Sequence, residues 1–112
     1  MFRKIKAKII VGRLEEDFEE SKKTYQKFNN WQTYLALLST LKPHRPFNSL
    51  TGEDAIFIAK KIGELNDLEK GFQFLCLTVY GVITEKINDI QTVKEALSKQ
   101  IDQIILEKEK SN

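Results

Sequence analysis

The sequence predicts an all-α fold, a compact bundle of four to five helices forming a single domain over residues 1–112. Apolar residues recur every three or four positions through most of the chain, which is the spacing of one helix face. Only two prolines and five glycines occur, so the frequent turns of a strand-rich fold are absent. A chain of this size buries roughly 65% of its unfolded surface, enough for a core without metals or disulfides.

Residues 1–13 form a basic N-terminal segment whose pattern fits two structures. Ile5, Ala7, Ile9 and Val11 alternate with lysines, which is typical of a strand, whereas Phe2, Ile5 and Ile9 also have helical spacing. A single strand needs a partner, and no second convincing strand follows. We therefore expect a helix, with strand pairing between molecules as the alternative.

Two amphipathic helices are expected next, separated by Asn29-Asn30. Acidic residues crowd positions 15–20, at the expected start of the first helix, where the helix dipole favours negative charge. Pro43 disfavours helical geometry in the residue before it, so the second helix should end near Lys42. The two apolar stripes are Leu14, Phe18, Ser21, Tyr25 and Phe28, and then Trp31, Tyr34, Leu35, Leu38 and Leu41.

Residues 43–50 are expected to form the main loop, followed by Thr51 as the N-cap of a third helix. That helix carries the stripe Ala55, Ile58, Ala59, Ile62 and Leu65, and Asn66-Asp67 ends it and can cap the next. Residues 68–87 are apolar on nearly every side. A helix of that kind belongs at the centre of a bundle, so we predict an apolar central helix near 68–87.

The last helix is expected after a break at Asn88-Asp89. Thr92 and Glu95 have the spacing of a capping box at its start. Residues 107–112 are charged and are predicted to be a frayed tail. The apolar stripe of this helix consists of Ile90, Val93, Leu97, Ile101 and Ile104.

No pattern in the sequence predicts catalytic, cofactor-binding or metal-binding residues. His44 is the only histidine, and the glycines are too scattered for a phosphate-binding loop. Cys76 lies in an apolar run and is expected to be a buried, inert thiol. A pocket lined by carboxylates around His44 or Tyr80 would favour an enzyme.

The charges occur in blocks. Residues 1–13 contain five basic and no acidic residues, residues 14–20 contain five acidic ones, and residues 21–52 again contain five basic and no acidic ones. A basic surface of this kind can bind nucleic acid through its phosphates, which gives one functional hypothesis. Its candidate contacts are Arg3, Lys4, Lys6, Lys8, Lys22, Lys23, Lys27, Lys42 and Arg45.

The preferred hypothesis is a non-enzymatic protein that acts through protein–protein interaction, as a regulatory, adaptor or assembly protein. Five apolar stripes in so small a bundle leave apolar surface to be covered by a protein partner or a second copy, with a homodimer expected. The candidate interface is the stripe Ile90, Val93, Leu97, Ile101 and Ile104.

Two statements about location accompany these hypotheses. No run of about 18 apolar residues occurs, so no transmembrane segment is predicted. The single cysteine cannot form an internal disulfide, which favours a cytoplasmic location. Membrane-surface attachment through residues 1–13 is a third functional hypothesis, because the segment is basic and amphipathic.

Overall fold

The computed structural model describes residues 2–25, 31–84 and 89–111. This part of the chain is helical, contains no strand, and confirms the predicted all-α bundle. Its elements are α1 (Phe2–Tyr25), α2 (Gln32–Thr40), a short 3-10 turn η1 (Phe47–Ser49), α3 (Gly52–Gly63), α4 (Leu68–Thr84) and α5 (Ile90–Ser111).

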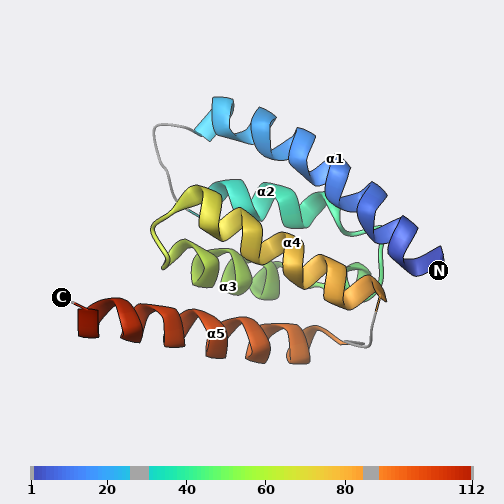
Figure 1. Ribbon diagram of the computed structural model, residues 1–112. Coiled ribbons are helices and arrows are strands. Elements are labelled where there is room, and N and C mark those ends of the chain that lie inside the picture. The colour runs from blue at the N-terminus through green and yellow to red at the C-terminus, as the bar shows by residue number, and fades with distance from the viewer. Residues whose placement is uncertain (1, 26–30, 85–88, 112) are drawn as a thin grey trace.

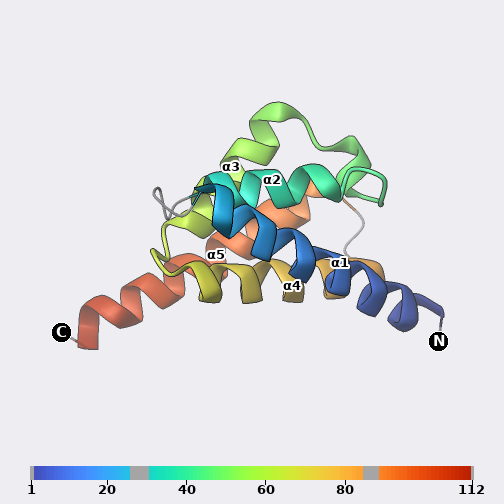
Figure 2. The ribbon, with the colours of Figure 1, turned by 90° about the horizontal axis from the view of Figure 1, so that it is seen from above.

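The helices pack in a stack with α1 at one edge and α5 at the other (Figure 1). α4 runs antiparallel to α1 along most of its length and also contacts α2 and α3. α5 lies against α3, and these two helices run parallel to each other (Figure 1). The N-terminal end of α1 and the C-terminal end of α5 extend to opposite sides of the molecule (Figure 2).

α1 is one continuous helix, so the prediction that residues 1–13 are helical is confirmed for the residues described. Ala7, Ile10, Leu14 and Phe18 face the core at intervals of three and four. The assignment of the acidic residues 15–20 to a helix start is wrong. The helix continues through residues 12 and 13, so these acids lie in its middle and its first turn contains none.

A glycine allows α4 to approach α2 closely. The Tyr34 hydroxyl, deep between the two helices, donates a hydrogen bond to the Leu68 carbonyl at 3.1 Å. A Cβ on Gly71 would lie 2.5 Å from Cζ of Tyr34 and 2.9 Å from Cγ2 of Ile62. Both distances are too short for carbon atoms, so a side chain at position 71 is incompatible with this packing.

Side-chain caps begin three of the helices, two of them as predicted. The Thr51 hydroxyl accepts the Asp54 N–H at 3.0 Å, and Asp67 accepts the Lys70 N–H at 3.1 Å. At α5 the prediction is wrong, because Asp89 rather than Thr92 is the cap. Its carboxylate accepts the Thr92 N–H at 2.8 Å and the Thr92 hydroxyl at 3.0 Å.

The apolar stripe of α5 is covered by the chain itself. Ile90, Val93, Leu97 and Ile101 are buried, and Ile104 packs against the same core. The expected interface is therefore not an open surface, because the stripe supplies the contact between α5 and α3. Two ion pairs flank that contact, Lys94 with Asp54 and Lys61 with Asp102. The helix extends to Ser111, so most of the tail predicted over residues 107–112 lies within it.

α4 occupies the central position that was predicted for the helix near 68–87. Residues 85–87 of that prediction lie outside the described residues. Leu75 and Val79 are fully buried. Leu77 is 70% exposed, so one face of this apolar helix is left uncovered. α4 therefore carries more apolar surface than the other helices of the bundle cover.

Candidate basic groove

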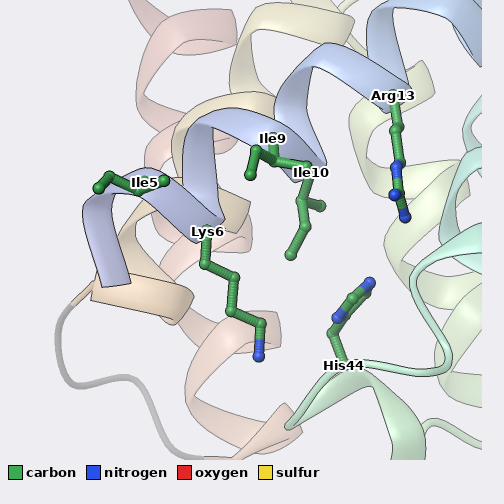
Figure 3. A pocket seen from close by; sticks show the side chains of 6 residues that line it. All are labelled: Ile5, Lys6, Ile9, Ile10, Arg13 and His44. Atoms are coloured by element: carbon green, nitrogen blue, oxygen red, sulfur yellow. The ribbon is translucent and has the colours of Figure 1, made fainter. Parts of the chain in front are cut away.

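A groove of about 410 Å³ lies between the first half of α1 and the loop after α2. Figure 3 shows the Lys6 and Ile10 side chains reaching from α1 towards the loop, and the His44 ring directed back at α1. No carboxylate of a described residue lines this groove. Its lining residues are Ile5, Lys6, Ile9, Ile10, Arg13 and His44.

α1 supplies the groove with both apolar and basic side chains. Ile10 is only 5% exposed and joins the core, whereas Ile5 and Ile9 are each 53% exposed. Lys6 and Arg13 are exposed, and no described acidic residue forms an ion pair with either. Half-exposed isoleucines are costly to hydrate, and here they lie beside cations with no described acidic partner, which makes this surface a candidate for binding.

The loop side of the groove is held in place by local hydrogen bonds and one buried anchor. Phe47 is fully buried in the bundle core. The His44 N–H donates to the Leu41 carbonyl at 2.9 Å, and the Asn48 N–H donates to the His44 carbonyl at 3.0 Å. His44 therefore lies in a hydrogen-bonded turn, so the groove is bounded by α1 on one side and by this turn on the other.

A second, smaller hollow of about 250 Å³ continues the groove along α1. The two share Ile10, Arg13 and His44, and the second adds Asp17 on α1 and Pro43 in the loop, among others. The charged residues described along the combined cleft are thus all basic at the Ile5 end and of both signs at the Asp17 end.

Burial and nearby cations set the charge of His44. Partial burial lowers the pKa of His44 below its ordinary value of 6.5, and the positive charges of Lys6 and Arg13 lower it further. The imidazole is therefore neutral at pH 7. No described carboxylate hydrogen-bonds to it, so the ring lacks the orienting acid of a catalytic triad.

The residues predicted to contact nucleic acid separate into two groups. Lys6 lines the groove, Lys8 is exposed on the same helix, and Lys42 and Arg45 are exposed in the loop beside His44. Lys22 lies about 24 Å from Lys6 along α1, at 1.5 Å per residue, and is therefore well outside the groove. Lys23 is exposed at that same end, and the side chains of Arg3, Lys4 and Lys27 lie outside those the structure describes.

Lys22 is held by interactions within the bundle. Its ammonium lies 3.0 Å from both Glu19 and Glu69 and sits over the Phe18 ring. Phe18 in turn stacks on Phe72 with ring centroids 4.1 Å apart. Hydrogen bonds to Glu19 and Glu69 raise the pKa of Lys22 above its ordinary value. This lysine links α1 to α4, which is a structural role.

Three further observations concern the described part of the chain. Cys76 is half-buried, and burial raises the pKa of its thiol to about 11, so the thiol is unreactive at neutral pH. No three potential metal-ligating side chains come together within residues 2–25, 31–84 and 89–111. None of the described helices has the length and apolar character needed to cross a membrane.

Sequence reasoning missed most of the groove. Lys6 alone was among the predicted contacts, while Ile5, Ile9, Ile10, Arg13 and His44 were not assigned to a site. One signal was present, because Ile5 and Ile9 are four residues apart on a different helix face from Ala7, Leu14 and Phe18. The contribution of His44 depends on a contact between distant segments.

Comparison with known proteins adds no functional information. No family model, no curated protein and no solved structure matches this chain significantly. Any functional conclusion therefore depends on the chemistry of the groove itself.

Proposed function

We propose that this protein is a non-enzymatic binding module that acts through protein–protein interaction, and that its binding surface is the groove between α1 and the His44 loop. The observation that carries the proposal is the half-exposure of Ile5 and Ile9 in a concave surface. Apolar side chains of this size gain most when a partner removes them from water. No described carboxylate lines the groove beside His44, so the ring lacks, among the described residues, the orienting acid that a catalytic histidine uses.

Nucleic-acid binding is the second candidate, since Lys6, Lys8, Arg13, Lys42 and Arg45 are contributed by α1 and the adjoining loop. Cations without acidic partners favour phosphate contacts. The apolar lining argues against it, because single-stranded nucleic acid is usually held by stacking on aromatic rings. Among the residues whose side chains the structure describes, no aromatic residue other than His44 lines this groove.

Self-association is part of the proposal and involves a different surface. The sequence of α4 from 71 to 84 contains no charged residue, and Leu77 on this stretch is 70% exposed. Two copies can bring these stretches together without desolvating a charge of α4 itself. Light scattering during size-exclusion chromatography tests this. A dimer that becomes a monomer in Leu77→Glu supports it, and a monomer at all concentrations contradicts it.

The proposal places the protein in the cytoplasm, since its one cysteine forms no disulfide within the chain and its thiol is protected by burial. This location stays a prediction. Fractionation of the native cells, with the protein detected by antibody, is the direct test.

Site-specific crosslinking tests the groove. A photo-reactive amino acid is placed at position 9 in the native cells, with position 56 as the matched control, because Ile56 is a similarly exposed isoleucine on α3. We expect a discrete protein adduct from position 9 and none from position 56. The adduct should resist nuclease and should disappear when Lys6→Glu reverses a groove charge.

The other outcomes discriminate among the candidates. A nuclease-sensitive adduct supports nucleic-acid binding, and an adduct of twice the chain mass identifies a second copy as the occupant. Equal adducts from positions 9 and 56, or none from position 9, contradict the assignment of the groove as a binding surface.

A further inference from the structure

We infer that the occupant of the groove is an acidic amphipathic helix of a protein partner, which lays an apolar stripe on Ile5 and Ile9 and places carboxylates against Lys6 and Arg13. This inference rests on the proposed function and adds the chemistry of the partner. It follows from three properties of the cleft: its apolar wall, its charge and its shape.

The apolar wall calls for an apolar stripe on the partner. Ile5 and Ile9 are four residues apart and present adjacent side chains along α1, each 53% exposed. Ile10 lies below them and is already part of the core. A partner helix with apolar residues at intervals of three and four packs its ridge alongside such a row.

The charge calls for carboxylates that flank this stripe. Lys6 and Arg13 are both exposed at the groove, two helical turns apart, and neither has a described acidic partner. Lys8 on α1 and Arg45 in the loop add positive charge nearby. Among the described residues that line the cleft, the one acid is Asp17, at the far end, so the carboxylates of the partner belong at the Ile5 end. Complementary charge of this kind fixes register and speeds association.

The shape favours a helix over a bilayer or a nucleic acid. From Ile5 to Asp17 the cleft follows α1 for about 18 Å, which is a little over three turns of a partner helix. The His44 loop forms the opposite wall, so the surface is concave. A bilayer presents a broad flat surface, which cannot enter a cleft. Phosphates satisfy Lys6 and Arg13 but leave Ile5 and Ile9 in water.

The test uses stapled helical peptides of about 12 residues, the length that spans the cleft. The first peptide carries a leucine stripe flanked by glutamates. The second keeps the leucines and replaces the glutamates by lysines, and the third keeps the glutamates and replaces the leucines by serines. A mixed-sequence DNA duplex and vesicles containing anionic phospholipid are added separately. His44 is the only histidine, so its imidazole NMR signals report directly on the groove.

We expect a saturable shift of the His44 signals only with the leucine–glutamate peptide. Ile9→Ser and Lys6→Glu should each weaken its binding at least tenfold. The matched controls Ile56→Ser on α3 and Lys99→Glu on α5 should bind as the wild type does, because both positions are exposed and lie outside the groove. Folding of each variant is checked by circular dichroism.

Three results overturn the inference. These are equal binding of the lysine peptide, a larger His44 shift with the duplex or the vesicles, and no His44 shift with millimolar leucine–glutamate peptide. The crosslinking at position 9 keeps this failure separate from that of the proposed function. A protein adduct there without peptide binding leaves the function standing and removes only the acidic helix as its partner.

Discussion

Substituting Gly71 by alanine adds one methyl group at the point where α4 meets Tyr34. That methyl would lie 2.5 Å from Cζ of Tyr34 and 2.9 Å from Cγ2 of Ile62, and still closer to the Tyr34 hydroxyl. The ring therefore has to move, and the hydroxyl loses its 3.1 Å bond to the Leu68 carbonyl. The substitution thus combines overpacking with loss of a hydrogen bond at a part-buried hydroxyl.

The expected cost follows from those two effects. Overpacking a core costs about 1–3 kcal/mol, and a buried hydroxyl left without a partner costs about 1–3 kcal/mol more. Replacing glycine by alanine within a helix stabilises the helix by about 1 kcal/mol, which offsets part of this loss. The net loss in the free energy of unfolding is then about 1–5 kcal/mol. Gly81→Ala is the matched control in the same helix, because a Cβ there meets no atom within 4 Å. It should raise stability by up to about 1 kcal/mol.

Urea unfolding followed by circular dichroism measures both variants. With a slope of about 1–3 kcal/mol per M, the two midpoints should differ by at least about 0.3 M, and by several M at the upper end of the expected loss. Adding Tyr34→Phe removes the nearest clashing atom, so Gly71→Ala should cost less in that background. Equal midpoints for Gly71→Ala and Gly81→Ala, or strict additivity with Tyr34→Phe, would refute the close approach of α2 and α4.

Three further predictions concern other parts of the bundle. Asp89→Ala removes the cap of α5 and should lower the free energy of unfolding by about 1 kcal/mol in thermal or urea unfolding, whereas an unchanged value would show that the cap is not used. Hydrogen bonds from Lys94 and Thr51 lower the pKa of Asp54, so its stabilising effect is complete above the unfolded pKa and is lost as pH falls through the folded one. The wild type should therefore lose more stability than Asp54→Asn on acidification from pH 5 to about pH 2, and parallel profiles would contradict this. Cys76, with a pKa of about 11, should react with Ellman's reagent at pH 8 about 100-fold more slowly in the folded chain than in urea, and equal rates would contradict its burial.

Periodicity predicted the helices well because it records which side chains share a face. The stripe of α3 and the cap at Thr51 are confirmed, since both depend on residues close in sequence. Periodicity does not record what covers a face. The stripe from Ile90 to Ile101 has the same pattern whether α3 or a second molecule covers it, and the structure shows that α3 does.

The charge blocks were a weaker guide, because the same residue type has different partners at the two ends of α1. Lys22 is paired with Glu69 of α4, 47 positions later in the sequence, while Lys6 has no described acidic partner. One difference is local, because Glu19 lies three residues before Lys22 and pairs with it, whereas no acid lies within four residues of Lys6. The contact with Glu69 is not local. Likewise, His44 comes beside Arg13 because the loop after α2 lies against α1, which the sequence around either residue does not record. Contacts of this range depend on the packing of the whole bundle.

Substitutions at Ile9 and Ile10, two adjacent isoleucines of α1, should distinguish an effect on stability from an effect on binding. Ile10 is 5% exposed and packs in the core, so Ile10→Ala should lower the free energy of unfolding by about 2–5 kcal/mol. Ile9 is 53% exposed, so Ile9→Ala removes little packing and gains helix propensity, and stability should change by no more than about 0.5 kcal/mol. Urea unfolding of the pair measures the contrast. A large loss in Ile9→Ala would mean that this side chain serves the bundle, and its exposure would then give no reason to expect a partner. A stable Ile9→Ala protein that no longer crosslinks from a neighbouring position such as Ile5 would mean that Ile9 contributes to binding and not to folding.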